Sequence, residues 1–149
     1  MALYVLDTDT VTLLRANHPE VSRRVTSVAP PDVVATTVIT VDEVLTGWYT
    51  LARRVNRPAQ IEWAYGQLAA AVVFLAGVPL LPLSRAAITE YDRLKTLKLN
   101  VGRNDLRIAA IAMENLAVVV TRNIRDFGRV PGLAVEDWSV PPGPAAAGS

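Results

Sequence analysis

Carboxylate and amide side chains follow the ends of short apolar runs at several separate places in the chain. Asp7 comes directly after the first run, Glu43 lies in the first turn of the helix expected after the second, and Asp105 opens a later helix. Asn123 and Asp126 lie in the loop after the fourth run. Carboxylates that converge repel one another unless a cation lies between them, and oxygen ligands suit Mg²⁺ or Mn²⁺. These residues therefore form a candidate site for a divalent metal ion.

Each of these residues also has a purely structural explanation. Asp7 and Asn104 are favourable N-cap residues, and Thr40 with Glu43 fits a capping box in which Glu43 bonds back to the Thr40 backbone N–H. The helix dipole alone favours an acid such as Asp105 in a first turn. However, an apolar strand precedes Asp7 and an apolar helix face follows Asp105, so both lie at the edge of the core. An uncompensated charge is costly there, and the combination favours a functional site.

Five arginines flank the candidate acidic cluster: Arg103, Arg107, Arg122, Arg125 and Arg129. Arginines at solvated helix ends are common and need no further explanation. Beside an acidic metal site, however, they suit a phosphodiester substrate. They would contact phosphates and position the backbone while the metal acts on the scissile group.

The composition limits the other classes of chemistry. The chain has 149 residues, of which 51% are hydrophobic and 19% charged, as in a single globular domain. Its 15 basic and 14 acidic residues give a net charge of +1, which excludes polyanion binding by bulk charge. The lack of cysteine excludes thiolate metal sites and thiol nucleophiles, and a single histidine, His18, excludes a ribonuclease with two catalytic imidazoles. Nucleotide-binding glycine loops are also absent.

Short runs rich in β-branched residues alternate with segments of helical period, which predicts an α/β fold with three layers, α/β/α. The central sheet should be mainly parallel with about five strands. The expected strands are Leu3–Leu6, Val33–Thr36, Leu80–Leu81, Ala117–Val120 and Leu133–Val135. The expected helices are Thr8–Ala16, Pro19–Val28, Val41–Arg54, Pro58–Ala76, Arg85–Leu97 and Asp105–Asn115. The carboxyl edge of such a sheet is where the acids would meet.

Residues 1–138 should form one domain, and residues 139–149 read as a disordered tail because proline and glycine follow in quick succession. Asp7 and Asp9 interrupt the first apolar run, so the N-terminus does not resemble a signal peptide and we expect a cytoplasmic protein. The longest apolar stretch, Leu68–Leu83, is broken by glycine and proline and is too short to cross a bilayer. No association with a membrane is expected.

Across nearly its whole length, from about Tyr4 to Trp138, the chain resembles a PIN domain, specifically the VapC-type toxin nucleases of bacterial toxin–antitoxin pairs. Three segments carry the resemblance in the same order: YVLDTD, TTVITVDEVLTGW and GRNDLRIAAIAMENLAVVVTRNIRDFGRVPGLAVEDW. The last segment is the most specific, with its acid, small-residue helix, apolar strand and T-R-N. The resemblance implies a PIN-like fold, in which a parallel sheet lies between helices.

The resemblance also implies roles for the acids. Asp7, Glu43 and Asp105 would bind Mg²⁺ or Mn²⁺ in an endoribonuclease that acts as a toxin and hydrolyses structured RNA such as tRNA. The fourth position of the family, often Asp, is Asn123 here, and Asp126 could share its role. Hydrolysis assisted by metal needs no base on the substrate 2′-OH, so the products should carry a 5′ phosphate and a 3′ hydroxyl.

The helices between residues 40 and 76 carry more large apolar side chains than one small sheet can cover. These are Val44, Leu45, Trp48, Leu51, Ile61, Trp63, Tyr65 and Leu68. Exposed apolar surface of this extent marks an interface. The resemblance implies two partners: a second copy in a homodimer, and a VapB-type antitoxin whose apolar helix would lie in a groove while a basic side chain enters the acidic site. Higher assembly is expected when the antitoxin is bound.

Two other functions remain open from the sequence. Asp7 and Asp9 fit the D-x-D-x-T nucleophile motif of haloacid-dehalogenase-like phosphatases, although the only lysines, Lys95 and Lys98, lie on a helix remote from a strand end. The chain could also be a binding module that keeps the PIN-like fold without catalysis, because the sequence does not show that the acids converge.

Overall fold

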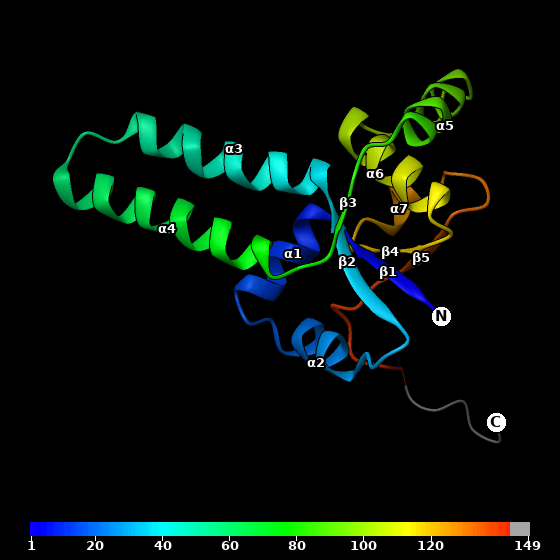
Figure 1. Ribbon diagram of the computed structural model, residues 1–149, viewed down its shortest axis with the longest axis horizontal. Helices are drawn as coiled ribbons and strands as arrows, with labels where there is room; N and C mark the ends of the chain where they lie inside the picture. The colour runs from blue at the N-terminus through cyan, green and yellow to red at the C-terminus, as the bar shows by residue number, and fades with distance from the viewer. Residues whose placement is uncertain (144–149) are drawn as a thin grey trace.

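Five short strands form one parallel sheet in the computed structural model, which describes residues 1–143 (Figure 1). The strand order across the sheet is β3-β2-β1-β4-β5, and every neighbouring pair is parallel. The strands are β1 (Leu3–Leu6), β2 (Val33–Thr37), β3 (Leu80–Leu81), β4 (Val118–Val120) and β5 (Ala134–Glu136). The predicted strands are confirmed, with ends that differ by a residue.

Helices connect the strands. All six predicted helices are present, and the structure adds one short helix, α7. They are α1 (Thr8–Arg15), α2 (Pro19–Ser27), α3 (Val38–Arg54), α4 (Pro58–Ala76), α5 (Arg85–Thr96), α6 (Arg103–Glu114) and α7 (Ile124–Phe127). α3 begins three residues earlier than predicted because the Thr37 hydroxyl caps it. α7 is a single turn, too short to show a periodic pattern in the sequence.

Two hydrophobic clusters lie on opposite faces of the sheet. Successive strand residues point to opposite sides. Val5 and Val119 accordingly join a cluster with α5, α6 and α7, whereas Leu6 and Val120 join a cluster with helices α1 to α4. Trp138 is buried in the second cluster and packs against the ring of Tyr4. The predicted three-layer α/β/α architecture is therefore confirmed.

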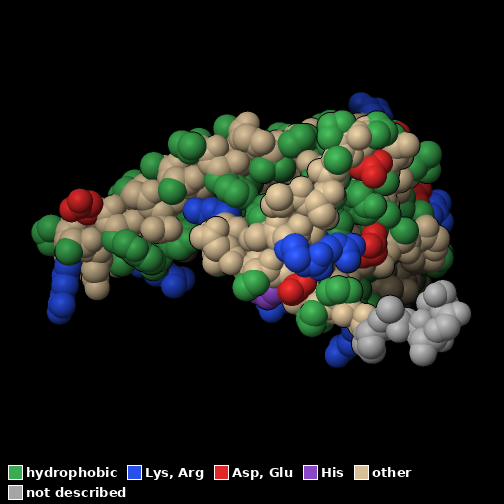
Figure 2. All heavy atoms as spheres, turned by 90° about the horizontal axis from the view of Figure 1, so that it is seen from below, with side chains coloured by type: hydrophobic (Ala, Val, Ile, Leu, Met, Phe, Trp, Pro, Cys, Tyr) green, Lys and Arg blue, Asp and Glu red, His purple; other side chains and the backbone are tan. Residues whose placement is uncertain are grey.

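α3 and α4 pack against each other and project from the sheet as a long arm, called the α3–α4 arm below (Figure 1). Trp48 and Trp63 join the two helices by an edge-to-face contact between their rings. Hydrophobic side chains occur along the length of this arm on the face shown in Figure 2. Trp63 is 54% exposed, and Ile61 and Tyr65 are also exposed. The predicted apolar surface is therefore present in part: three of the eight side chains named from the sequence are exposed, Val44 is buried, and the other four are partly buried.

The order of the strands reverses beside β1. The chain builds β1, β2 and β3 outward in one direction and then crosses to place β4 on the other side of β1. Ligands of open parallel sheets bind at such a reversal, outside the carboxyl ends of the strands. Leu6 pairs with Thr36 on one side and Val120 on the other, so the residues that follow these three strands emerge side by side.

The C-terminal segment leaves the sheet after β5. Ser139 donates hydrogen bonds to the carboxylate of Asp137 through both its backbone N–H and its hydroxyl. Residues 144–149, which make up most of the expected disordered tail, lie outside the described residues. Among the residues described, none of the helices has the length and apolar character needed to span a membrane.

Candidate active site

Asp7 lies at the end of β1 and is only 5% exposed. Its carboxylate accepts a hydrogen bond from the backbone N–H of Thr10 at 2.8 Å, so it caps α1 as predicted. Burial raises the pKa of this carboxyl, while hydrogen bonds from Thr121 and Thr10 act in the opposite direction. A capping role alone does not require burial, so the fold bears an additional cost to hold this acid at the sheet edge.

Glu43 does not form the predicted capping box with Thr40. The cap of α3 is Thr37, whose hydroxyl accepts from the Thr40 backbone N–H at 3.2 Å. Because the helix begins earlier than expected, Glu43 lies in its second turn, beyond reach of the helix end. Its Oε1 instead accepts a hydrogen bond from the Thr8 hydroxyl at 2.7 Å, and that hydroxyl lies 3.1 Å from the Thr40 hydroxyl. The carboxylate is therefore directed toward α1.

Asp105 is the third residue of α6, which begins at Arg103. The prediction that Asn104 caps this helix is wrong, because the N-cap is Gly102 and no side chain makes the capping hydrogen bond. Asp105 is half-buried and stands in the first turn, where the helix dipole favours a negative charge.

The electrostatics of Asp105 show that acids from separate elements come together. Its pKa is raised to about 6, mainly by burial and then by the negative charges of Asp7, Glu43 and Asp126, while the Asn123 amide acts in the opposite direction. The structure thus brings all five predicted site residues to one edge of the sheet. Among residues 1–143, no three acids already stand as close as the ligands of a bound metal ion.

Asn123 and Asp126 form a single hydrogen-bonded unit after β4. The Asn123 side chain accepts from the Asp126 backbone N–H at 3.3 Å and donates to the Asp126 carboxylate at 2.9 Å. The Thr121 hydroxyl accepts from the Asn123 backbone N–H at 2.8 Å. Arg129 donates to the other oxygen of Asp126 at 3.0 Å. Asp126 is therefore partly neutralised, and it helps to orient Asn123.

Three of the five predicted arginines have local partners. Arg107 lies over the ring of Tyr91, with 5.2 Å between the guanidinium carbon and the ring centroid. Arg129 is held by Asp126, and Arg125 lies 3.7 Å from the same carboxylate. The contacts of Arg107 and Arg129 account for those two side chains without a substrate, whereas Arg125 is 81% exposed.

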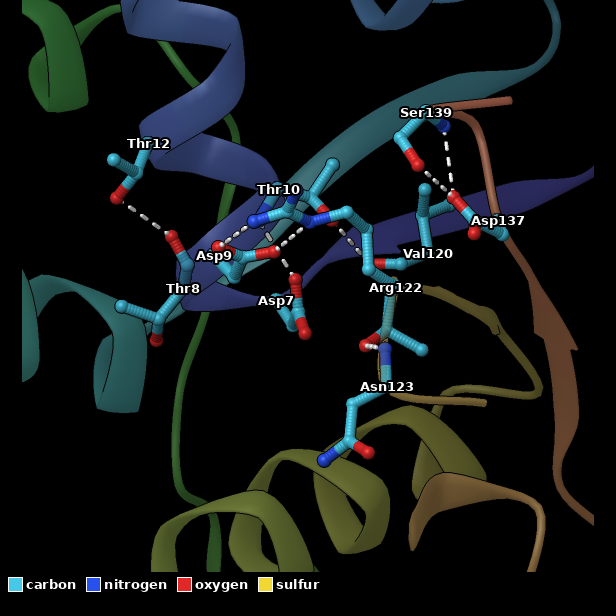
Figure 3. Close-up of polar contacts among 11 residues, drawn as sticks. Asp7, Thr8, Asp9, Thr10, Thr12, Val120, Arg122, Asn123, Asp137 and Ser139 are labelled. Carbon is cyan, nitrogen blue, oxygen red and sulfur yellow. Dashed lines mark hydrogen bonds and ion pairs between the residues drawn. The ribbon is translucent and has the colours of Figure 1, made fainter. Parts of the chain in front are cut away.

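The other two arginines differ from these. Arg103 is exposed at the start of α6. Arg122 reaches from the end of β4 to the first turn of α1, where Nε and Nη2 donate to the two carboxylate oxygens of Asp9 at 2.6 and 2.9 Å (Figure 3). The hydrogen bond to Asp9 raises the pKa of Arg122 above its ordinary value. Asp7 lies beside this ion pair in the same view.

Two grooves reach the Glu43 carboxylate from the two flanks of α3. The larger, of about 530 Å³, is lined by polar residues of α3 together with Asn104 of α6. The smaller, of about 340 Å³, lies between α1 and α3 and includes Thr8 and Trp48. Both include Gly47, where an added Cβ would meet no atom within 4 Å. Of the five candidate site residues, Glu43 is the one that lines these grooves, so they give a ligand access to its side of the acidic edge.

Sequence reasoning missed the hydroxyl that holds Glu43. Thr8 donates to Glu43 from α1, 35 positions away in the sequence, so spacing alone does not reveal the contact. The Thr10 hydroxyl donates to the Val120 carbonyl and ties the start of α1 to the end of β4. The available signal is that Thr8 directly follows Asp7, a site residue at the end of a strand.

Comparisons with known proteins agree with this architecture. No family model matches the chain. It is 29% identical to the protein named Ribonuclease VapC1 from Haemophilus influenzae strain R2866, over 92% of this chain and 98% of the relative. A shorter match, 50% identical over 38 residues, covers 26% of this chain and 29% of the tRNA(fMet)-specific endonuclease VapC of Salmonella typhimurium.

Comparison with solved structures also leads to VapBC proteins. The structure of VapBC-1 from nontypeable Haemophilus influenzae superposes with a TM-score of 0.74 at 26% identity, covering 93% of this chain and 99% of that chain. VapBC-5 of Mycobacterium tuberculosis, described as a member of the VapBC family of toxin–antitoxin systems, has a TM-score of 0.60 at 27% identity, covering 94% of this chain and 100% of that one.

The parallel sheet with its reversal beside β1, the acidic carboxyl edge and these likenesses define a PIN-like α/β/α protein. Within that class, the chain is a homologue of the ribonucleases named VapC, and the resemblance seen in the sequence is confirmed.

The raised pKa of Asp105 predicts a pH-dependent cost to stability. The folded state binds the Asp105 proton more tightly than the unfolded state, so ionisation of this group lowers stability as pH rises from about 4 to about 6. Without divalent ions, Asp105→Asn should therefore raise the free energy of unfolding at pH 7.5 by about 1 kcal/mol, after allowance for solvent screening. Urea unfolding between pH 4 and 7.5 measures this gain, which should vanish near pH 4.

Asp92→Asn is the matched control, because Asp92 is exposed on α5 and pairs with Lys95. It should change the stability by no more than about 0.5 kcal/mol at either pH. If Asp105→Asn instead lowers the stability at pH 7.5, burial and the neighbouring acids do not destabilise the charged form of Asp105.

Proposed function

We propose that this chain is a metal-dependent endoribonuclease and the toxin of a toxin–antitoxin pair. The observation that carries the proposal is the gathering of four acids from four elements at the switch point of the sheet, in a fold shared with VapC relatives along nearly the whole chain. The relatives named ribonuclease or tRNA-specific endonuclease make RNA, and tRNA in particular, the first substrate to test.

The partner of the toxin would be a VapB-type antitoxin, as in the VapBC complexes to which the chain is similar. An apolar antitoxin helix fits the exposed apolar side chains of the α3–α4 arm, which also offers a surface for a homodimer. The toxin would act in the cytoplasm, where its RNA substrates are found, and its expression without the antitoxin should harm the cell.

The donor set at the sheet edge suits Mg²⁺ or Mn²⁺. Asp7, Glu43 and Asp105 offer carboxylate oxygens, the ligands that hard divalent cations prefer, and their mutual repulsion is relieved by a cation between them. These three side chains would hold the ion, with Asn123 and Asp126 close by. A bound divalent ion supplies a hydrolytic nucleophile at neutral pH and stabilises the charge that develops on the phosphate and the leaving oxygen.

The chain itself supplies the positioning. Asp7 is fixed by the Thr10 backbone N–H at the start of α1, so its carboxylate cannot turn away from the sheet edge. Glu43 is held toward the same edge by the Thr8 hydroxyl. Asp105, with a pKa of about 6, is ionised at neutral pH and can serve there as a ligand, whereas below about pH 6 a proton competes with the metal.

Removal of the Thr8 hydroxyl tests this positioning. Thr8→Val keeps the shape of the side chain and deletes its hydrogen bond to Glu43, so both the affinity for Mn²⁺ and the rate of RNA cleavage should fall by about 10- to 100-fold. Thr12→Val is the control, since its hydroxyl, one turn further on α1, bonds only to the Thr8 carbonyl. Calorimetric titration with Mn²⁺ measures the affinity, and equal affinities of the two variants would contradict the role of Thr8.

The phosphatase alternative has little support in the structure. Its motif needs Asp9 free to act as acid and base beside Asp7, but Asp9 is engaged by Arg122. It also needs a lysine at the site, and Lys95 pairs with Asp92 on α5.

Expression in a bacterial host without an antitoxin tests the proposal as a whole. Wild-type protein should arrest growth and cut RNA, leaving 5′ phosphate and 3′ hydroxyl ends, because hydrolysis assisted by metal does not use the 2′-OH. Asp7→Asn removes a ligand charge but keeps a capping side chain, so it should abolish cleavage and relieve the arrest while the protein stays folded. Asp92→Asn, on the exposed surface of α5, should still arrest growth.

Sequencing of RNA ends after brief expression gives both the substrate and the end groups. Products with a 2′,3′-cyclic phosphate would contradict the metal-dependent reaction. A wild-type protein that is harmless and cleaves no RNA with Mg²⁺ or Mn²⁺ would favour the non-catalytic binding module instead.

A further inference from the structure

Arg122 and Asp9 form an ion pair that links two elements at the rim of the acidic edge. The two residues are 113 positions apart in the sequence, and both oxygens of Asp9 are engaged. Arg122 directly follows the buried Thr121 at the end of β4, while Asp9 lies in the first turn of α1, two residues after Asp7. The pair therefore joins the two strand ends at which the sheet reverses its order.

Stability alone is a weak reason for this pair. The side chains of Arg122 and Asp9 are 51% and 47% exposed, and ion pairs in solvent contribute little to folding. Asp9 also places one more negative charge beside the buried carboxylate of Asp7. An additional acid in an acidic site is unfavourable unless it does something else there.

The guanidinium of Arg122 keeps one donating edge free. Its Nε and Nη2 face Asp9, so the second proton of Nη2 and both protons of Nη1 have no acceptor among residues 1–143. An arginine offers two such edges, each of which matches a phosphate or carboxylate by paired hydrogen bonds. Asp9 thus fixes the plane of the guanidinium at the rim of the site and leaves its Nη1–Nη2 edge without a partner among residues 1–143.

The other arginines near the site have other partners. Arg129 donates through Nη1 to Asp126 and to the Asn100 carbonyl, so it is held beside Asp126, and Arg107 lies over an aromatic ring. Arg125 is 81% exposed and only approaches the Asp126 carboxylate. Arg103 has no charged partner to fix its direction among the described residues. Among the five flanking arginines, Arg122 is the one that a carboxylate holds at the end of the site where Asp7 lies.

We infer that Arg122 is the phosphate-binding residue of the site, that it grips a backbone phosphate of the RNA next to the scissile one, and that Asp9 is the residue that positions it. This inference rests on the proposed ribonuclease function. The inference assigns phosphate binding to one of the five flanking arginines. It gives Asp9 a role in substrate binding rather than in metal binding.

The test measures RNA binding without cleavage. Fluorescence anisotropy of a fluorescein-labelled tRNA(fMet), in EDTA and over about 50 to 300 mM salt, gives both the affinity and its salt dependence. Arg122→Ala should weaken binding and reduce the slope of log affinity against log salt by about 0.7 to 1, the loss of one phosphate contact. Arg122→Lys should keep most of the slope but lose affinity, because lysine cannot make the paired contact.

The matched control is Arg23→Ala. Arg23 is also 51% exposed and also donates through Nε and Nη2, to Glu20 on the same helix α2. It lies away from the acidic edge, so its loss should leave the slope unchanged. With cleavage restored by Mn²⁺, Arg122→Ala should raise KM more than it lowers kcat, which a purely structural ion pair would not do.

The direction in which Asp9→Ala changes the affinity for RNA tests whether Asp9 positions Arg122. Loss of a negative charge alone would tighten RNA binding, whereas loss of the support for Arg122 should weaken it. Unchanged or tighter binding by Asp9→Ala would overturn the role of Asp9. An Arg122→Ala slope equal to that of the wild type would overturn the phosphate site and leave the proposed function intact. Wild-type protein that neither binds nor cleaves RNA would instead overturn the proposed function itself.

Discussion

Burial of carboxylates close to one another at one edge of a parallel sheet is the constraint on which the rest of the structure depends. Asp7 is buried there, and Asp105 is half-buried and feels the charges of three other acids. In the unfolded chain the carboxylates of Asp7 and Asp105 would be hydrated and far apart, yet the strands and helices of the folded protein hold them together. This cost is consistent with a site whose charge is completed by a cation, and acids arranged only to cap helices would not need it.

The scaffold meets this constraint in two ways. The reversal of strand order beside β1 brings the ends of β1 and β4 together, so residues more than a hundred positions apart become neighbours. Threonine hydroxyls and backbone N–H groups then fix the individual acids, as Thr8 does for Glu43 and Thr10 for Asp7. Strands and helix starts therefore determine the geometry, and the grooves on the two flanks of α3 lead to Glu43.

The sequence predicted the parts of this arrangement that depend on local patterns. Runs of β-branched residues mark the buried parallel strands, and Asp7 follows such a run, so its capping and its place at the sheet edge could both be foreseen. The partner of Glu43 could not be predicted, because the start of α3 depends on Thr37 and the hydrogen bond to Glu43 comes from α1. The five arginines were equivalent in sequence for the same reason, since their partners are set by tertiary packing.

Location of the bound metal ion is the most direct test of the central claim that these acids form one cation site. Crystals grown with Mn²⁺ and measured near its absorption edge should give an anomalous peak about 2.1 Å from carboxylate oxygens of Asp7 and of Glu43 or Asp105. The Glu43 carboxylate should still accept from Thr8 in that structure. A protein that cleaves RNA with Mn²⁺ but binds the ion elsewhere, with no peak among these three acids, would contradict the claim.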